Sequence, residues 1–172
     1  MIMGKQLKIS GIIKNSIVDG EGLRYVIFTQ GCPHHCPGCH NPGTHDFGGG
    51  TWKDTDEIYD DIILDPSITG VTFSGGEPFM QCEALFFLSS KLKLKGYSLW
   101  SYSGFTVEEL LKRSDEYTLK FLSNLDVLVD GRFILSKKSL MLLFRGSENQ
   151  RLISVPKTLR KKKPVLWTPR AR

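Results

Sequence analysis

Short runs of β-branched and aromatic residues alternate along this chain with longer segments whose apolar residues recur at helical spacing. The strand-like runs lie at 7–13, 23–29, 70–73, 98–102 and 127–129, and the helical segments lie at 54–64, at 81–95 and from Thr106 onward. Strands joined through helices run parallel, because a parallel pair needs a crossover connection. The alternation therefore predicts an α/β fold with a mainly parallel sheet.

Local signals mark several of the predicted boundaries. Pro66 ends the first helix, Gly96 ends the second, and Thr106 with Glu109 forms the pattern of a capping box at the start of the third. Toward the C-terminus, three further runs are expected to be strands or strand-like, at 140–144, 151–155 and 165–167.

Length and composition fit one globular domain over 1–172, since 40% of the 172 residues are hydrophobic and 24% are charged. The first ten residues lack the apolar stretch of a signal peptide, and no later segment is long enough to cross a bilayer. We therefore expect a cytoplasmic protein with no membrane partner. In that reducing compartment, clustered cysteines are metal ligands or catalytic groups more often than disulfide partners.

The net charge of +5 is concentrated near the C-terminus, in a basic tail at about 156–172 and the segment before it. Residues 145–172 contain one acidic residue, Glu148, and nine basic residues, namely Arg145, Arg151, Lys157, Arg160, Lys161, Lys162, Lys163, Arg170 and Arg172. Such a tail can bind nucleic acid or an acidic protein, or it can simply be solvated. Solvation is the favoured interpretation, and a nucleic-acid partner is not expected.

Three cysteines fall within eight residues, Cys32, Cys36 and Cys39, with Cys-x3-Cys-x2-Cys spacing. A cubane iron–sulfur cluster is usually held by four thiolates, so three leave one iron with an open coordination position. Zinc is the alternative, because it accepts mixed cysteine and histidine ligands. All four histidines of the chain lie in the same region, His34, His35, His40 and His45.

A second motif, Gly75-Gly76-Glu77-Pro78, follows the strand predicted at 70–73. Two glycines leave backbone amides and carbonyls unshielded, so these groups can pair with a polar ligand, while Glu77 is placed to hold the local geometry. The cysteine segment, this motif, the run 102–104 and Asp130 all follow predicted strands. In α/β folds ligands bind at the carboxyl ends of strands, so these segments are expected to form one site.

The cysteine triplet followed by the Gly-Gly-Glu-Pro motif resembles the radical S-adenosylmethionine superfamily. More narrowly, the chain resembles the activating proteins of anaerobic ribonucleoside-triphosphate reductase over nearly its whole length. The runs that carry this resemblance are 19–24, 31–42, 99–105, 126–133 and 145–151.

The resemblance implies a radical S-adenosylmethionine core folded as an incomplete, TIM-like α/β barrel, since a complete barrel typically needs about 250 residues. It implies reductive cleavage of S-adenosyl-L-methionine, at a [4Fe-4S] cluster, to methionine and a 5′-deoxyadenosyl radical. This radical would generate a glycyl radical on the reductase, the protein substrate. The implied electron donor is reduced flavodoxin or a similar protein, and a homodimer is possible within the family.

By the same resemblance, Cys32, Cys36 and Cys39 ligate the cluster. The S-adenosylmethionine site would be formed by Gly38, Cys39, His40, Gly75, Gly76 and Glu77, with Asp130 toward the methionine end. His40 stands where relatives often carry tyrosine or another aromatic residue, and its imidazole can still stack on adenine. Cys82 is interpreted as a small core residue.

Two other functions stay open from the sequence. One is a radical S-adenosylmethionine enzyme with a different substrate, either like 7-carboxy-7-deazaguanine synthase or another glycyl-radical activase. The other is a zinc-stabilised module that binds nucleic acid through the basic tail. The run 145–151 favours the reductase as partner.

Overall fold

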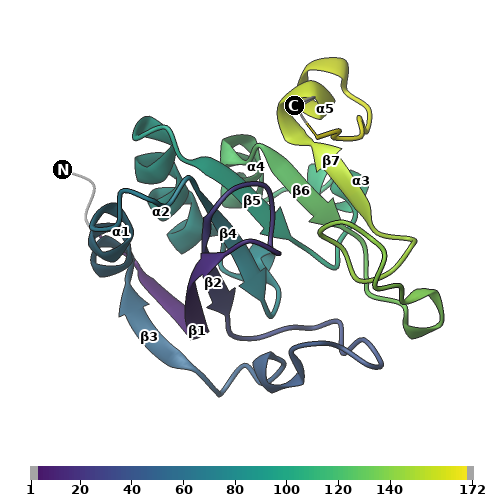
Figure 1. Cartoon of the computed structure of the whole chain (residues 1–172), viewed down its shortest axis with the longest axis horizontal. Coiled ribbons are helices and arrows are strands. Elements are labelled where there is room, and N and C mark those ends of the chain that lie inside the picture. Colours follow the sequence, from purple (N-terminus) through teal and green to yellow (C-terminus); the bar gives the residue numbers. More distant parts are fainter. Residues whose placement is uncertain (1–3, 170–172) are drawn as a thin grey trace.

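Seven strands form one open sheet in the order β3-β1-β2-β4-β5-β6-β7. A computed structural model describes residues 4–169, and the first three residues of the chain and the last three of the predicted basic tail lie outside this range. The strands are β1 (Gln6–Ser16), β2 (Arg24–Thr29), β3 (Thr51–Asp54), β4 (Gly70–Gly75), β5 (Ser98–Tyr102), β6 (Val127–Asp130) and β7 (Arg151–Ser154) (Figure 1).

In residues 4–169, five α-helices and three 3-10 turns lie between these strands or after the last of them. The helices are α1 (Thr55–Ile63), α2 (Cys82–Leu94), α3 (Val107–Leu111), α4 (Glu116–Asn124) and α5 (Val155–Lys161). The 3-10 turns are η1 (Pro42–Thr44), η2 (Pro78–Met80) and η3 (Leu135–Lys137). In residues 4–169, no helix combines the length and apolar character needed to cross a membrane.

The four central strands β2, β4, β5 and β6 run parallel, whereas β1, β3 and β7 pair antiparallel with their neighbours at the two edges. The α/β prediction is therefore confirmed, and the parallel arrangement holds in the centre of the sheet. The sheet does not close on itself, because β3 and β7 are its two ends. All four parallel strands consequently end at one edge, where the loops that follow them meet.

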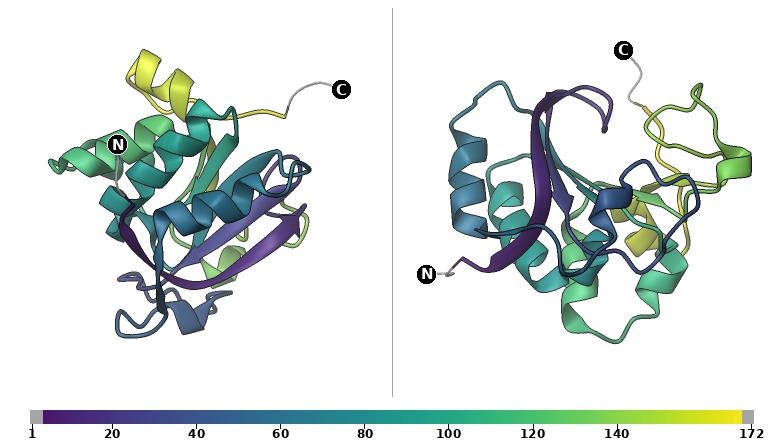
Figure 2. Two further views of the ribbon diagram at one scale, coloured as in Figure 1. Left: turned by 90° about the vertical axis from the view of Figure 1, so that its left-hand side faces the viewer. Right: turned by 90° about the horizontal axis from the view of Figure 1, so that it is seen from below.

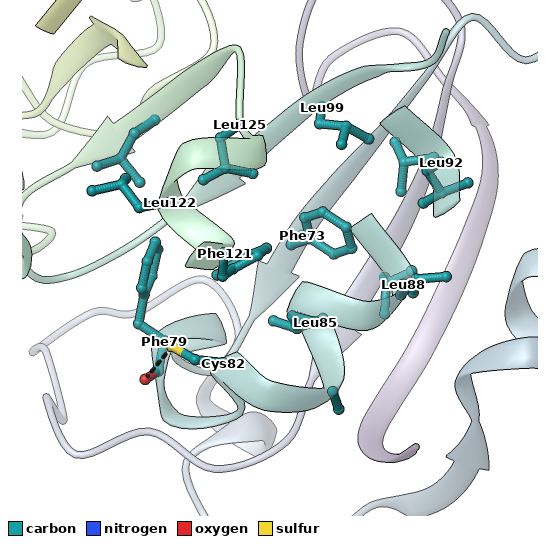
Figure 3. Close-up of a cluster of buried hydrophobic side chains, with 14 of the residues drawn as sticks. Phe73, Phe79, Cys82, Leu85, Leu88, Leu92, Leu99, Phe121, Leu122 and Leu125 are labelled. Carbon is teal, nitrogen blue, oxygen red and sulfur yellow. Dashed lines mark hydrogen bonds between the residues drawn. The ribbon is translucent and has the colours of Figure 1, made fainter. Parts of the chain in front are cut away.

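Helices cover one face of the sheet and form the main core with it. Figure 3 shows Phe73 of β4 among side chains of α2 and α4, including Leu85, Leu88 and Phe121. The Phe73 and Phe121 rings lie 5.4 Å apart in an edge-to-face arrangement. A smaller cluster lies on β5 and β6, where Trp100, Val127 and Val129 pack against residues of the C-terminal part of the chain. The two clusters together hold the parallel strands in place, and with them the loops that follow these strands.

Two sequence predictions need correction. The run 140–144 is not a strand, since it forms turns in which Leu140 and Met141 are about nine-tenths exposed. The predicted strand 151–155 ends at Ser154, because Val155 begins α5. The run 165–167 is strand-like, as expected, because Leu166 bridges to Ile153 and backbone hydrogen bonds join this run to β7 on both sides of the bridge. An apolar run becomes a strand only where a neighbouring strand offers backbone partners.

Three elements were not predicted from the sequence, β3, α4 and α5. The three residues 51–53 of β3 are exposed, so the strand has no apolar alternation and is defined by its pairing with β1. Helix α4 is capped by Asp115, whose side chain accepts from the Thr118 N–H. Helix α5 lies within the predicted basic tail, and its last turn carries Arg160 and Lys161. Part of that tail is therefore helical.

Candidate functional site

The loops after β2, β4, β5 and β6 enclose one cavity of about 490 Å³ at the carboxyl edge of the sheet. Six of the predicted site residues line it, namely Cys32, Cys36, Cys39, His40, Gly75 and Gly76. Gly38, Glu77 and Asp130 are not among its lining residues. The loops after these four strands thus meet at one cavity, but Asp130, which was expected to be part of the site, does not line it.

The cysteine segment is held by backbone hydrogen bonds to residues that follow it. The Gly31 N–H donates to the Thr44 carbonyl over 2.8 Å, and the Cys32 N–H donates to the His45 carbonyl over 3.1 Å. Cys32, Cys36 and Cys39 are free thiols, and burial raises the pKa of the Cys32 thiol. Within residues 4–169, no three His, Cys, Asp or Glu side chains converge closely enough to hold a single metal ion. A cubane cluster is ligated at separate irons, so its thiolates do not need to converge on one point.

The Glu77 carboxylate joins three loops beneath the cavity. Its Oε1 accepts from the Phe79 N–H (3.0 Å) and the Ser103 hydroxyl (3.0 Å). Its Oε2 accepts from the Gly104 N–H (2.8 Å) and lies 2.7 Å from His34 Nε2. The side chain is fully buried. Glu77 thus ties the cysteine segment to the glycine motif and to the loop after β5, as a positioning residue.

Two glycines allow backbone to approach where a side chain would not fit. Gly75 has a φ of +90°, and a Cβ there would lie 2.5 Å from the Thr29 backbone nitrogen. A Cβ on Gly104 would lie 2.3 Å from the His34 ring. The close packing of the glycine motif on β2, and of the loop after β5 on His34 of the cysteine segment, therefore depends on glycine.

Asp130 is fully buried at the end of β6, and its carboxylate is engaged by protein groups. Oδ2 accepts from the Val107 N–H over 2.8 Å, and both oxygens accept from the Arg151 guanidinium, Oδ1 over 3.0 Å. Arg151 also pairs with Glu108, and these two carboxylates, Asp130 foremost, raise the pKa of its guanidinium. The same guanidinium holds the pKa of Glu108 below its ordinary value. In this structure Asp130 therefore fixes α3 and β7 relative to β6.

His40 and Gly38 meet the segment that follows β6. The His40 ring lies 4.9 Å from the ring of Phe133, and both residues line the cavity. Gly38 has a φ of +72° and lies against Leu135. An imidazole and a phenyl ring at one wall of the cavity offer flat apolar surface, on which a planar ligand group can pack.

Cys82 is separate from this site. Its side chain is buried in the main core, its Sγ donates to the Phe79 carbonyl over 3.2 Å, and burial raises the pKa of its thiol to about 11 (Figure 3). The interpretation of Cys82 as a core residue is confirmed.

Several lining residues were not singled out from the sequence. Val18 comes from the β1–β2 turn, while Phe133, Leu142 and Arg145 come from the segment between β6 and β7. Phe133 and Arg145 lie in runs that carry the family resemblance, and this was the only signal for them. The Arg145 Nε is buried and has no hydrogen-bond partner within residues 4–169, and its NH1 donates to the Gln150 carbonyl. Arg145 thus adds a positive charge to the cavity wall.

Comparison with known proteins agrees with the cysteine-lined cavity. A family model described as a 4Fe-4S single cluster domain matches residues 18–153. The chain is similar to the anaerobic ribonucleoside-triphosphate reductase-activating proteins of Haemophilus influenzae (34% identity) and Vibrio cholerae (35%). Each match covers 143 residues, 78% of this chain and 89% of the relative.

A third relative is the pyruvate formate-lyase-activating enzyme of Listeria monocytogenes, which is 34% identical over 159 residues, 87% of this chain and 62% of that enzyme. The family model covers most of the chain, and the reductase-activating relatives are matched over most of their own length. On these grounds the chain belongs to the 4Fe-4S single cluster domain family and, within it, to the anaerobic ribonucleoside-triphosphate reductase-activating proteins.

Proposed function

We propose that this protein activates an anaerobic ribonucleoside-triphosphate reductase by generating a glycyl radical on it. The observation that carries the proposal is the cavity that is lined both by three cysteines and by Gly75 and Gly76. The similarity to anaerobic ribonucleoside-triphosphate reductase-activating proteins supports the same function. When bound, a reduced [4Fe-4S] cluster supplies the electron that cleaves S-adenosyl-L-methionine to methionine and a 5′-deoxyadenosyl radical.

The donor set fits such a cluster. Cys32, Cys36 and Cys39 are free, face the same cavity and come from a single loop. Three thiolates satisfy three of the four irons, which leaves one iron for a ligand that is not a protein side chain. The cavity extends from these thiols to Gly75 and Gly76, so a chelating ligand can reach both. We assign the cluster to these three cysteines.

The other residues of the cavity bind and orient the nucleoside. The Gly76 N–H donates to the Thr29 carbonyl over 2.8 Å, so polar groups of the methionine end would pair with the carbonyls of Gly75 and Gly76. His40 and Phe133 form an aromatic wall suited to adenine. Glu77 and Gly38 do not line the cavity and act by positioning the residues that do. Glu77 holds three loops together, and Gly38 permits the turn between the second and third cysteines. No side chain is needed as general acid or base, because the cofactor carries the chemistry.

Hydrogen abstraction then takes place on the partner protein. The 5′-deoxyadenosyl radical removes one hydrogen atom from a glycine Cα of the reductase, which yields 5′-deoxyadenosine and the glycyl radical. An open sheet suits this substrate, because a loop of a large protein can enter from the side. We further propose that the sheet is a partial barrel of the radical S-adenosylmethionine type. Reduced flavodoxin as donor, self-association and a cytoplasmic location stay predictions.

The covered fraction of each relative favours the reductase, rather than another glycyl-radical enzyme, as the protein substrate. The reductase-activating proteins are covered over 89% of their length, and the pyruvate formate-lyase-activating enzyme over 62%. The latter therefore contains substantial sequence that has no counterpart in this match.

Anaerobic reconstitution with iron and sulfide tests the function. The purified protein should bind iron and sulfide and form 5′-deoxyadenosine when dithionite and S-adenosyl-L-methionine are added. With the reductase present, electron paramagnetic resonance should show a glycyl radical. Cys39→Ala should abolish cluster binding, whereas Cys82→Ala is the matched control and should keep it. Zinc in a colourless protein, or no 5′-deoxyadenosine from reconstituted material, would contradict the proposal.

A further inference from the structure

Two segments at the mouth of the cavity expose large apolar side chains to solvent. In the β1–β2 turn, Ile17 and Val18 are 73% and 70% exposed. In the segment between β6 and β7, Leu140 and Met141 are 90% and 93% exposed, with Leu143 at 54%. We call these five residues the mouth rim. Single exposed apolar residues need no explanation, but a group of them beside a cavity indicates a binding surface.

Both segments of the mouth rim border the same cavity. Val18 lines it from one side, and Leu142 and Phe144, which alternate with the exposed residues, line it from the other. The right-hand view of Figure 2 shows the β1–β2 turn (purple) and the segment after β6 (yellow-green) projecting on the same side of the molecule. Both segments are therefore within reach of a large molecule bound at the cavity.

The segment after β6 is fixed by specific hydrogen bonds. The Tyr102 hydroxyl donates to the Phe144 carbonyl over 2.7 Å, at the base of the exposed turn. The Gln150 side chain accepts from the N–H groups of Gly146 and Ser147 through Oε1, over 2.9 and 3.1 Å. The exposed side chains are thus presented on an ordered support, which lowers the entropic cost of binding.

The charge on this segment indicates what kind of molecule it can bind. Arg132, Lys137 and Lys138 are exposed beside the apolar residues, and none of them forms an ion pair within residues 4–169. Apolar contact flanked by cations suits a protein segment with its own apolar side chains and nearby carboxylates. A small metabolite would not cover five side chains at the mouth.

We propose that the mouth rim is the docking surface for the glycine-bearing segment of the reductase. The segment would lie between Ile17 and Val18 on one side and Leu140, Met141 and Leu143 on the other, with its glycine directed into the cavity. The inference rests on the proposed function for the identity of the partner. The location of the surface rests on exposure and on continuity with the cavity.

The docking surface is tested by measuring reductase binding and the formation of 5′-deoxyadenosine separately. The variant pair Leu140→Ser and Met141→Ser, made together in the reconstituted full-length protein, removes two side chains that do not line the cavity. The matched control is Leu64→Ser with Leu94→Ser, which are 80% and 89% exposed at the ends of α1 and α2. Neither residue lines the cavity, and both lie at the ends of helices that pack on the main-core face of the sheet.

We expect the rim variant to bind the reductase about tenfold more weakly and to lose glycyl radical yield to a similar extent. Its partner-free formation of 5′-deoxyadenosine should equal that of the wild type, and the control should match the wild type in every assay. Ile17→Ser should weaken reductase binding in the same direction from the other side of the mouth.

Unchanged reductase binding in the rim variant, or an equal loss in the control, would overturn the docking surface. So would a change in the sedimentation of the activase alone with reductase binding unaffected, because the rim would then be a contact between copies of this chain. Failure of the proposed function is seen separately, as a wild-type protein that forms no 5′-deoxyadenosine. Direct binding by titration calorimetry decides the docking surface independently of that result.

Discussion

The ion-pair cluster of Asp130, Arg151 and Glu108 predicts a definite order of destabilisation. Replacing Arg151 with Met leaves the fully buried Asp130 carboxylate with the Val107 N–H as its remaining donor within residues 4–169. Leaving a buried charge uncompensated costs about 3–5 kcal/mol, and we expect the lower end, about 3 kcal/mol, because the Arg151 side chain is 32% exposed.

The other two replacements should cost less. Asp130→Asn keeps an acceptor for Val107 but loses the charge that Arg151 binds, so we expect about 2 kcal/mol. Glu108→Gln breaks a pair whose carboxylate side chain is 44% exposed, and surface pairs contribute at most about 1 kcal/mol. The expected order of lost stability is Arg151→Met, then Asp130→Asn, then Glu108→Gln.

Urea unfolding of the cluster-free protein with reduced thiols, followed by circular dichroism at neutral pH, measures these differences. Binding of S-adenosyl-L-methionine to reconstituted Asp130→Asn adds a second readout. If Asp130 is structural, this variant is less stable but binds the nucleoside like the wild type once folded. Wild-type stability together with weakened binding would refute the structural role and restore the sequence hypothesis that Asp130 contacts the methionine end.

Three further outcomes follow from individual side chains. Gly75→Ala should lose roughly 3 kcal/mol, from the positive φ and from a Cβ 2.5 Å from the Thr29 nitrogen, as measured by the urea midpoint. Cys82, with a buried thiol of pKa about 11, should be alkylated only after unfolding, as followed by mass spectrometry. Burial and the hydrogen bond to Asp61 raise the pKa of Tyr25. The contribution of Tyr25 to the free energy of unfolding is therefore full below the ordinary tyrosine pKa and declines as the pH rises above it. Tyr25→Phe should flatten this decline when unfolding is measured at alkaline pH.

The sequence predicted the central strands and their common edge because both are local properties. Residues 70–73 and 127–129 are short apolar runs that end in glycine or aspartate, and they are buried strands in the structure. The capping box at Thr106 and Glu109 is present as predicted, since it involves only residues three apart. Periodicity and capping are thus sufficient where an element is defined by its own sequence.

What could not be predicted depends on residues far apart in the chain. Strand β3 exists because β1 lies beside it, and the apolar run 140–144 is not a strand because no strand in the described part of the chain, residues 4–169, pairs with it. The partner of Asp130 is Arg151, 21 residues further on, and no local pattern joins them. The contribution of Arg145 and Leu142 to the cavity likewise depends on how the segment before β7 folds back.

The carboxylate of Glu77 has a consequence for how the protein acquires its cofactors. Because protein groups alone fix the cysteine segment, the glycine motif and the loop after β5 against one another, the apoprotein is preorganised. The loops have already lost their conformational entropy during folding. The affinity of the protein for iron, sulfide and nucleoside is therefore not reduced by the cost of ordering these loops. Maturation should accordingly be limited by the supply of iron and sulfide, with little change in the circular dichroism of the backbone on loading.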